Sequence, residues 1–93
     1  MSHLKSQPDW SRSRQPLYLQ LAAIFRSRIE NGLWPRGEQI PTIDTLMEEF
    51  GVGRVTVRKA FAELEEEGLL VSARGRGTFV RELPKNSLLR FDI

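Results

Sequence analysis

The feature that most constrains the fold is a three-residue link, Gly51-Val52-Gly53, between two segments whose apolar residues have helical spacing. On both sides the apolar positions fall at i, i+3, i+4 and i+7, which places them on one helix face. They are Ile43, Leu46, Met47 and Phe50 before the link, and Val57, Ala60, Phe61 and Leu64 after it. Two helices joined by so short a turn containing glycine are typical of a helix-turn-helix motif.

The two helices of this motif carry their own start and stop signals. Thr42 can cap the first helix, Asp44 is favourably placed in its first turn, and Gly51 ends it. The second helix is predicted over residues 54–67, because Gly68 supplies a C-terminal stop.

A third helix is predicted upstream, over residues 16–31. Pro16 suits its first position, where the missing N–H costs nothing, and Asn31-Gly32 supplies a left-handed stop. Residues 33–38 then have the composition of a turn, and Trp34 is expected to pack beneath it.

A hairpin is predicted after the helices. Leu69–Ser72 and Thr78–Arg81 are expected to be strands, joined by a turn at residues 74–77. The pattern therefore predicts an α+β fold: a three-helix winged helix-turn-helix with a C-terminal two-stranded β-hairpin as the wing.

Three regions follow from this assignment. Residues 1–14 are polar and are predicted to be a flexible tail, and residues 15–82 form the folded domain. Residues 83–93 are interpreted as a linker and the start of a missing C-terminal effector domain, because Leu88–Ile93 is apolar enough to be a strand.

Composition excludes several classes of function. The 93 residues contain no cysteine and a single histidine, His3, so disulfides, thiolate metal sites and histidine-based catalysis have almost no material. No signal peptide and no apolar run of roughly 20 residues is found, so a membrane span is not expected. We expect a cytoplasmic protein that is not an enzyme and needs no cofactor.

The second helix of the motif has a basic face. On a helical wheel, Arg54, Val55, Arg58 and Lys59 lie on one side, away from the apolar residues that would face the core. A major groove admits one helix, arginine can read guanine with two hydrogen bonds, and both Arg and Lys neutralise phosphates. The face therefore predicts binding to DNA.

The order of charge along this helix supports that interpretation. Its cations precede its acids Glu63, Glu65, Glu66 and Glu67, so both groups oppose the helix dipole by roughly a few tenths of a kcal/mol each. An anionic partner bound at the N-terminal half of the helix would explain this order of charge. The acids at the other end would then repel phosphates and so disfavour binding in a wrong register. A solvated face of i,i+4 ion pairs is the alternative, but only Lys59 has an acid, Glu63, at that spacing.

The predicted hairpin turn, Arg74-Gly75-Arg76-Gly77, is also basic, and no acid occurs from Leu69 to Arg81. Glycine permits close backbone approach, and arginine suits the negative potential of a narrow minor groove. A plain turn that needs positive φ is the alternative. Its place after a helix-turn-helix favours a wing that contacts DNA.

Several motifs together resemble the GntR family of bacterial transcription regulators, and the start and the wing look most like its HutC subfamily. The resemblance covers residues 15–82. It rests on Pro16-Leu17-Tyr18, Pro35-Arg36-Gly37-Glu38-Gln39-Ile40-Pro41, Gly51-Val52-Gly53-Arg54-Val55-Thr56-Val57-Arg58-Lys59-Ala60, Leu64-Glu65-Glu66-Glu67-Gly68-Leu69-Leu70 and Gly75-Arg76-Gly77-Thr78-Phe79-Val80.

The resemblance implies a regulator, such as a repressor, that binds a palindromic double-stranded operator as a homodimer, under control of a small-molecule effector bound by another domain. By position, Arg54, Thr56 and Arg58 match the family's contacts from the recognition helix, and residues 75–77 match its wing tip. The candidate DNA-binding residues are Thr42, Arg54, Val55, Thr56, Arg58, Lys59, Arg74, Gly75, Arg76 and Gly77.

The sequence departs from the family pattern at three places. The family commonly has Ser-Glu-Arg where this chain has Thr42-Ile43-Asp44, so that arginine contact is absent or reversed in sign. Gly53 replaces a Ser or Thr cap, and Val55 replaces a polar residue and could touch a thymine methyl group. The operator is therefore expected to differ from the commoner family sites.

Two other functions are alternatives to DNA binding. The basic face could dock an acidic protein, which would leave the chain unable to bind duplex DNA. An enzyme would need a convergent set of catalytic groups, which the sequence does not offer.

Overall fold

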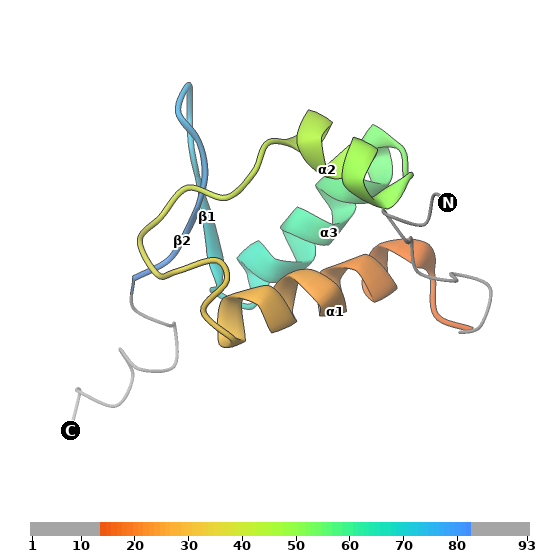
Figure 1. Cartoon of the computed structure of the whole chain (residues 1–93), viewed down its shortest axis with the longest axis horizontal. Helices are drawn as coiled ribbons and strands as arrows, with labels where there is room; N and C mark the ends of the chain where they lie inside the picture. The colour runs from red at the N-terminus through yellow and green to blue at the C-terminus, as the bar shows by residue number, and fades with distance from the viewer. Residues whose placement is uncertain (1–13, 83–93) are drawn as a thin grey trace, which may run out of the picture.

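The computed structural model describes residues 14–82, in which three helices are followed by a hairpin (Figure 1). The elements are α1 (Leu17–Glu30), α2 (Ile43–Phe50), α3 (Arg54–Glu66), β1 (Leu70–Ala73) and β2 (Gly77–Val80). The predicted α+β fold class is therefore confirmed. The predicted tail and linker, apart from residue 14, lie outside the described residues.

The helix ends differ slightly from the prediction, for reasons of capping. Pro16 is the N-cap of α1 rather than its first residue, and Asn31 is its C-cap, followed by Gly32 with φ +82°. In α2, Thr42 caps the helix as predicted: its Oγ1 accepts a hydrogen bond from the Thr45 amide at 3.2 Å. Gly51, with φ +66°, ends α2 in the left-handed conformation.

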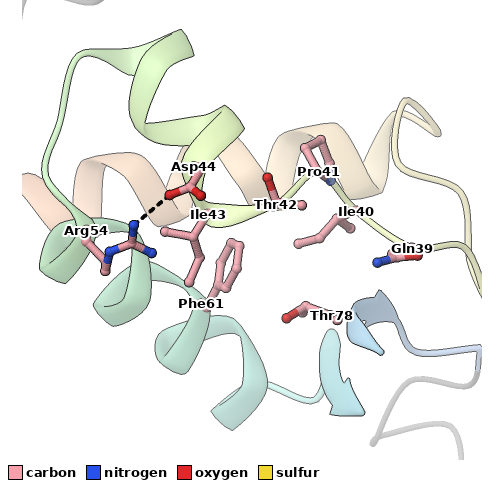
Figure 2. Close-up of a pocket in the computed structure, with 10 residues that line it drawn as sticks. Gln39, Ile40, Pro41, Thr42, Ile43, Asp44, Arg54, Phe61 and Thr78 are labelled. Carbon is pink, nitrogen blue, oxygen red and sulfur yellow. Dashed lines mark hydrogen bonds and ion pairs between the residues drawn. The ribbon is translucent and has the colours of Figure 1, made fainter. Parts of the chain in front are cut away.

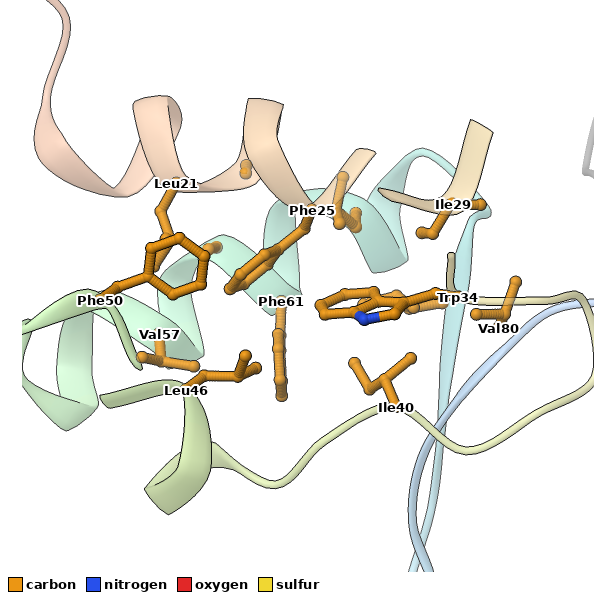
Figure 3. Close-up of a cluster of buried hydrophobic side chains, with 14 residues drawn as sticks. Leu21, Phe25, Ile29, Trp34, Ile40, Leu46, Phe50, Val57, Phe61 and Val80 are labelled. Atoms are coloured by element: carbon orange, nitrogen blue, oxygen red, sulfur yellow. The ribbon is translucent and has the colours of Figure 1, made fainter. Parts of the chain in front are cut away.

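One aromatic cluster joins the three helices to the turn after α1 (Figure 3). The ring of Phe25, which is fully buried in α1, lies 5.1 Å from Trp34, 5.8 Å from Phe50 and 5.7 Å from Phe61, measured between centroids. Such aromatic pairs add about 0.5–1.5 kcal/mol beyond area burial. Trp34 thus packs beneath its turn, as predicted, and the core fixes α3 against α1.

The hairpin is shifted by one residue relative to the predicted strands. Leu70 pairs with Val80 and Ala73 with Gly77, so the tip is a three-residue loop, Arg74–Arg76, and Gly77 already belongs to β2. The Arg76 amide closes the loop by donating to the Ala73 carbonyl at 2.8 Å. Side chains of Leu70 and Val80 enter the core and anchor the hairpin to the helices.

A segment predicted only as turn and extended chain pairs with β2 through an isolated antiparallel β-bridge between Gln39 and Phe79. The Gly37 amide donates to the Val80 carbonyl at 2.9 Å, and the Ile40 amide donates to the Thr78 carbonyl at 2.9 Å. In the opposite direction the Val80 amide donates to the Glu38 carbonyl at 3.0 Å. At the base of the hairpin, β2 is therefore hydrogen-bonded to β1 on one side and to residues 37–40 on the other.

In the described part of the chain, no helix is long and apolar enough to cross a membrane.

Candidate nucleic-acid interface

Two basic features lie on the same side of the molecule. In Figure 1, the N-terminal end of α3 and the tip of the hairpin both lie on the side away from α1. The core fixes the angle of α3, and the pairing of β2 with residues 37–40 fixes the hairpin. This side therefore presents the two groups of candidate DNA-binding residues together.

The start of α3 exposes the predicted face. Val55 is 66% exposed, Arg58 is exposed and Thr56 is half-buried. Within residues 14–82, the Arg58 guanidinium has no hydrogen bond or ion pair. Its charge is therefore available to a partner from outside this part of the chain.

The first turn of α3 is also open to an anion. Its N-cap is Gly53, which makes no side-chain hydrogen bond to the helix, and no acid occupies the first turn. The first N–H groups of a helix have no partner within the helix and carry the positive end of its dipole. Together with Arg58, this end of α3 has the chemistry of a phosphate contact.

Arg54 has a partner that was not predicted. Its Nη2 donates to Asp44 Oδ1 at 2.6 Å, across the link between α2 and α3 (Figure 2). Helical spacing offers Arg54 no acid one turn further along α3, and its partner comes from α2 instead. Asp44 thus neutralises part of the basic face. Thr42 lies beside this pair, exposed at the start of α2.

Lys59 lies at the edge of the face, toward α1. Its Nζ is 5.6 Å from the centroid of the Tyr18 ring, a cation–π contact. Within residues 14–82, Lys59 has no ion pair with Glu63, the acid that helical spacing offered as its partner. Two of the three cations on this face are thus held by other elements.

The acids at the end of α3 make specific contacts within the fold. Glu65 Oε2 accepts from Ser72 Oγ of β1 at 2.6 Å, which ties α3 to the hairpin. Glu67 accepts from Arg26 Nε at 2.8 Å and from Arg26 Nη2 at 2.5 Å. The hydrogen bonds to Glu67 raise the pKa of the Arg26 guanidinium above its ordinary value. Glu65 and Glu67 therefore have structural roles, which were not predicted.

The tip of the hairpin exposes two further cations. Arg74 and Arg76 are exposed, and within residues 14–82 their guanidinium groups have no partner. Gly75 has φ +77° with open space around it. Because the tip is small, has open space around Gly75 and carries two positive charges, it can enter a narrow groove of DNA.

Gln39 supports the tip from the segment that bridges to β2, a role the sequence did not reveal. Its Nε2 donates to the Arg76 carbonyl at 2.9 Å. It also lies so close to Gly77 that a Cβ there would be 2.3 Å from Nε2, and Gly77 has φ +115°. Gly77 is therefore required by its backbone conformation, and a side chain there would also displace the Gln39 amide from the Arg76 carbonyl.

The described residues offer no metal site, and they form a groove beside the Asp44–Arg54 pair. Within residues 14–82, no group of three or more His, Asp or Glu side chains could hold a metal ion. A groove of about 270 Å³ lies between the start of α2, the start of α3 and the hairpin, and Asp44, Arg54 and Thr78 are among the residues that line it (Figure 2).

Relatives of known sequence match most of the chain. The histidine utilization repressor of Pseudomonas putida is 38% identical over 78 residues, which cover 84% of this chain and 31% of the repressor. MngR of Escherichia coli K12, a mannosyl-D-glycerate transport/metabolism system repressor, is 46% identical over 73% of this chain and 28% of its own length. The chain thus spans about a third of the length of these relatives. They are repressors rather than enzymes, in agreement with the prediction.

Solved structures agree with the fold. The DNA-binding domain of AraR in complex with operator ORE1 is 42% identical, with a TM-score of 0.70 over 83% of this chain and 94% of that domain. YtrA of Sulfolobus acidocaldarius, a GntR-family transcription factor, is 30% identical, with a TM-score of 0.72 over 88% of this chain and 86% of its own. The family model for bacterial regulatory proteins of the gntR family matches residues 17–80. The chain is a DNA-binding domain that belongs to the GntR family, with HutC-like relatives.

Proposed function

We propose that the chain binds operator DNA with the start of α3 in the major groove and the tip of the hairpin in the minor groove. One observation carries the proposal: within residues 14–82 the guanidinium groups of Arg58, Arg74 and Arg76 have no partner, and the elements that carry them, the start of α3 and the tip of the hairpin, lie on the side away from α1 (Figure 1). Phosphate neutralisation supplies most of the affinity of such surfaces.

The start of α3 would read bases. Arg58 can donate two hydrogen bonds to guanine O6 and N7, and Val55 can contact a thymine methyl group. Thr56 and Lys59 lie beside them and would contact the backbone. Thr42 Oγ1 accepts from the Thr45 amide and lies 3.0 Å from Thr45 Oγ1; with the Thr45 hydroxyl as the donor in that second bond, Thr42 would donate its own proton to a phosphate.

The tip of the hairpin would follow the adjacent minor groove. Arg74 and Arg76 fit the negative potential of a narrow groove, and Gly75 and Gly77 let the backbone approach the DNA. The support from Gln39 would hold the tip in the orientation that α3 requires.

Three further parts of the proposal rest on the family. We propose that two copies bind a palindromic operator, that a small-molecule effector bound outside this sequence controls the binding, and that the protein acts in the cytoplasm. A dimer with two-fold symmetry binds an operator with two-fold symmetry. The centres of its half-sites lie about one turn of the DNA helix apart, or a whole number of turns. AraR provides a parallel, because its DNA-binding domain was crystallised with operators.

A salt titration tests the proposal. Binding of a fluorescent duplex, selected from random DNA, should weaken steeply with salt, because counterions are released. About five phosphate contacts give a log–log slope of roughly −4 to −5. A scrambled duplex of equal length should bind more weakly. A binding constant that does not change with salt would exclude this function. So would failure to bind any duplex together with formation of a stable complex with an acidic protein.

A further inference from the structure

The most informative unassigned feature is the ion pair between Asp44 and Arg54. From it we infer that the two side chains act as one base-reading unit, in which Asp44 accepts from a cytosine amino group and orients Arg54 toward a guanine. The inference deepens the proposed function and rests on it. The unit would make one G·C-containing step of each half-site a determinant of specificity.

Stability does not explain the pair. The Arg54 side chain is 51% exposed and the Asp44 side chain 76% exposed, although the two atoms are only 2.6 Å apart. Exposed ion pairs contribute little to folding. The pairs that join α1 to α2 and to α3 are less exposed and hold packed helices together. The Asp44–Arg54 pair instead joins two helix N-termini at the surface that we assign to DNA.

Arg54 can read a base while it stays paired. Only its Nη2 contacts Asp44, and it does so through a single bond. A guanidinium has five N–H donors on two edges that share Nη2. Whichever Nη2 proton goes to Asp44, the other edge keeps two parallel donors, which is what guanine O6 and N7 accept.

Asp44 keeps acceptor capacity of its own. Oδ1 receives the bond from Arg54, and within residues 14–82 no hydrogen bond occupies Oδ2. Among base edges in the major groove, cytosine N4 is the donor that a carboxylate accepts from. A carboxylate is repelled by phosphate, so Asp44 also disfavours contacts of this surface with the DNA backbone.

The surroundings of the pair are suited to a base edge. The groove beside it is lined by short polar groups of Thr42 and Thr78 and by apolar groups of Ile43 and Phe61, with no second acid. Figure 2 shows the pair at one end of this groove and Thr78 of β2 at the other. Asp44 is thereby the single negative charge among the residues that line it.

Selection of bound sequences from random DNA tests the inference, using the 93-residue chain and the variants Asp44→Asn, Arg54→Ala and the double variant. Glu48→Gln is the matched control, because it removes one charge from an exposed acid of the same helix. Thermal melting checks that each variant folds. Discrimination at the affected base pair is then measured with matched duplexes that differ only there.

Asp44→Asn should lower discrimination at one G·C-containing step about tenfold and raise affinity for non-operator DNA. Glu48→Gln should leave base preference unchanged. Because the pair acts as a unit, the double variant should lose hardly more than either single variant. An unchanged preference in Asp44→Asn, or additive losses, would overturn the inference while leaving operator binding intact. If the unmodified chain selects no sequence, the proposed function itself fails.

Discussion

Arg26 and Arg28 of α1 have the same chemistry as Arg58, Arg74 and Arg76 of the α3–hairpin side, and opposite surroundings. Arg28 is held by Glu49, with Nη2 and Oε2 2.5 Å apart, and its guanidinium lies 5.0 Å from the Phe50 ring centroid. Arg26 is held by two bonds to Glu67. By contrast, Arg58 and Arg76 have no partner for their guanidinium groups among residues 14–82. The availability of the charge, rather than its presence, distinguishes the binding side.

The comparison has a physical basis. A cation that already donates to a carboxylate gains little by moving to a phosphate, because it must first break the bonds it has. A solvated guanidinium releases only water and counterions when it binds. We therefore expect substitutions on α1 to change stability and substitutions on the other side to change binding.

The largest effect should come from Arg58→Ala. If Arg58 reads a base, its loss should cost about 1–3 kcal/mol of operator binding and relax the preference at one position. Stability should hardly change, because the side chain is exposed and its guanidinium has no hydrogen bond or ion pair within residues 14–82. Fluorescence anisotropy with matched duplexes measures the first effect and urea denaturation the second. An equal loss on every sequence would reassign Arg58 to phosphate.

Arg28→Ala should have the converse effect. It leaves Glu49 without its partner and uncovers Phe50 and Trp34, which should lower the free energy of unfolding by about 1–2 kcal/mol. Operator affinity of the folded protein should remain the same. Weaker DNA binding at unchanged stability would break the comparison between the two sides.

Gly77→Ala should affect the hairpin through its backbone. At φ +115° and with Gln39 Nε2 in the way, the added methyl group should cost about 1–2 kcal/mol of stability and displace the tip. Gly75→Ala is the matched control, because it has positive φ but open space. Urea denaturation should show a lower free energy of unfolding for Gly77→Ala than for Gly75→Ala. The double variant Gly77→Ala/Gln39→Ala should recover part of the stability that Gly77→Ala loses. Equal costs for the two glycines would contradict the contact.

Arg76→Ala should have the smallest effect, a change in salt dependence. Removal of one cation near the DNA should reduce the magnitude of the log–log slope by about 0.9. Arg26→Ala, which removes a cation from the partnered side, should leave the slope unchanged. Equal slopes for Arg76→Ala and the unmodified chain would remove Arg76 from the interface.

Local signals in the sequence were sufficient for most of the fold. The spacing of apolar residues predicted the three helices, and glycines such as Gly51 and Gly68 predicted where helices end. Both signals depend on neighbouring residues alone. The hairpin was also recognised, with an error of one residue. The pairing of residues 37–40 with β2 was missed, since an isolated β-bridge is defined by the partner it pairs with and not by the composition of its own segment.

The candidate site divides in the same way. The exposed face with Val55 and Arg58 followed from helical periodicity. The contacts of Arg54 with Asp44 and of Lys59 with Tyr18 join residues that are far apart in sequence or on different helices. Such contacts depend on how the helices cross, which no local pattern encodes.

The most direct test of the account is an NMR titration of the isotope-labelled chain with its selected operator duplex. We predict that the largest amide shift changes will fall at residues 53–59 and 74–77, while residues 26–28 of α1 hardly change. Changes centred on α1, or spread evenly over the domain, would contradict the assignment of α3 and the hairpin tip as the DNA-binding side.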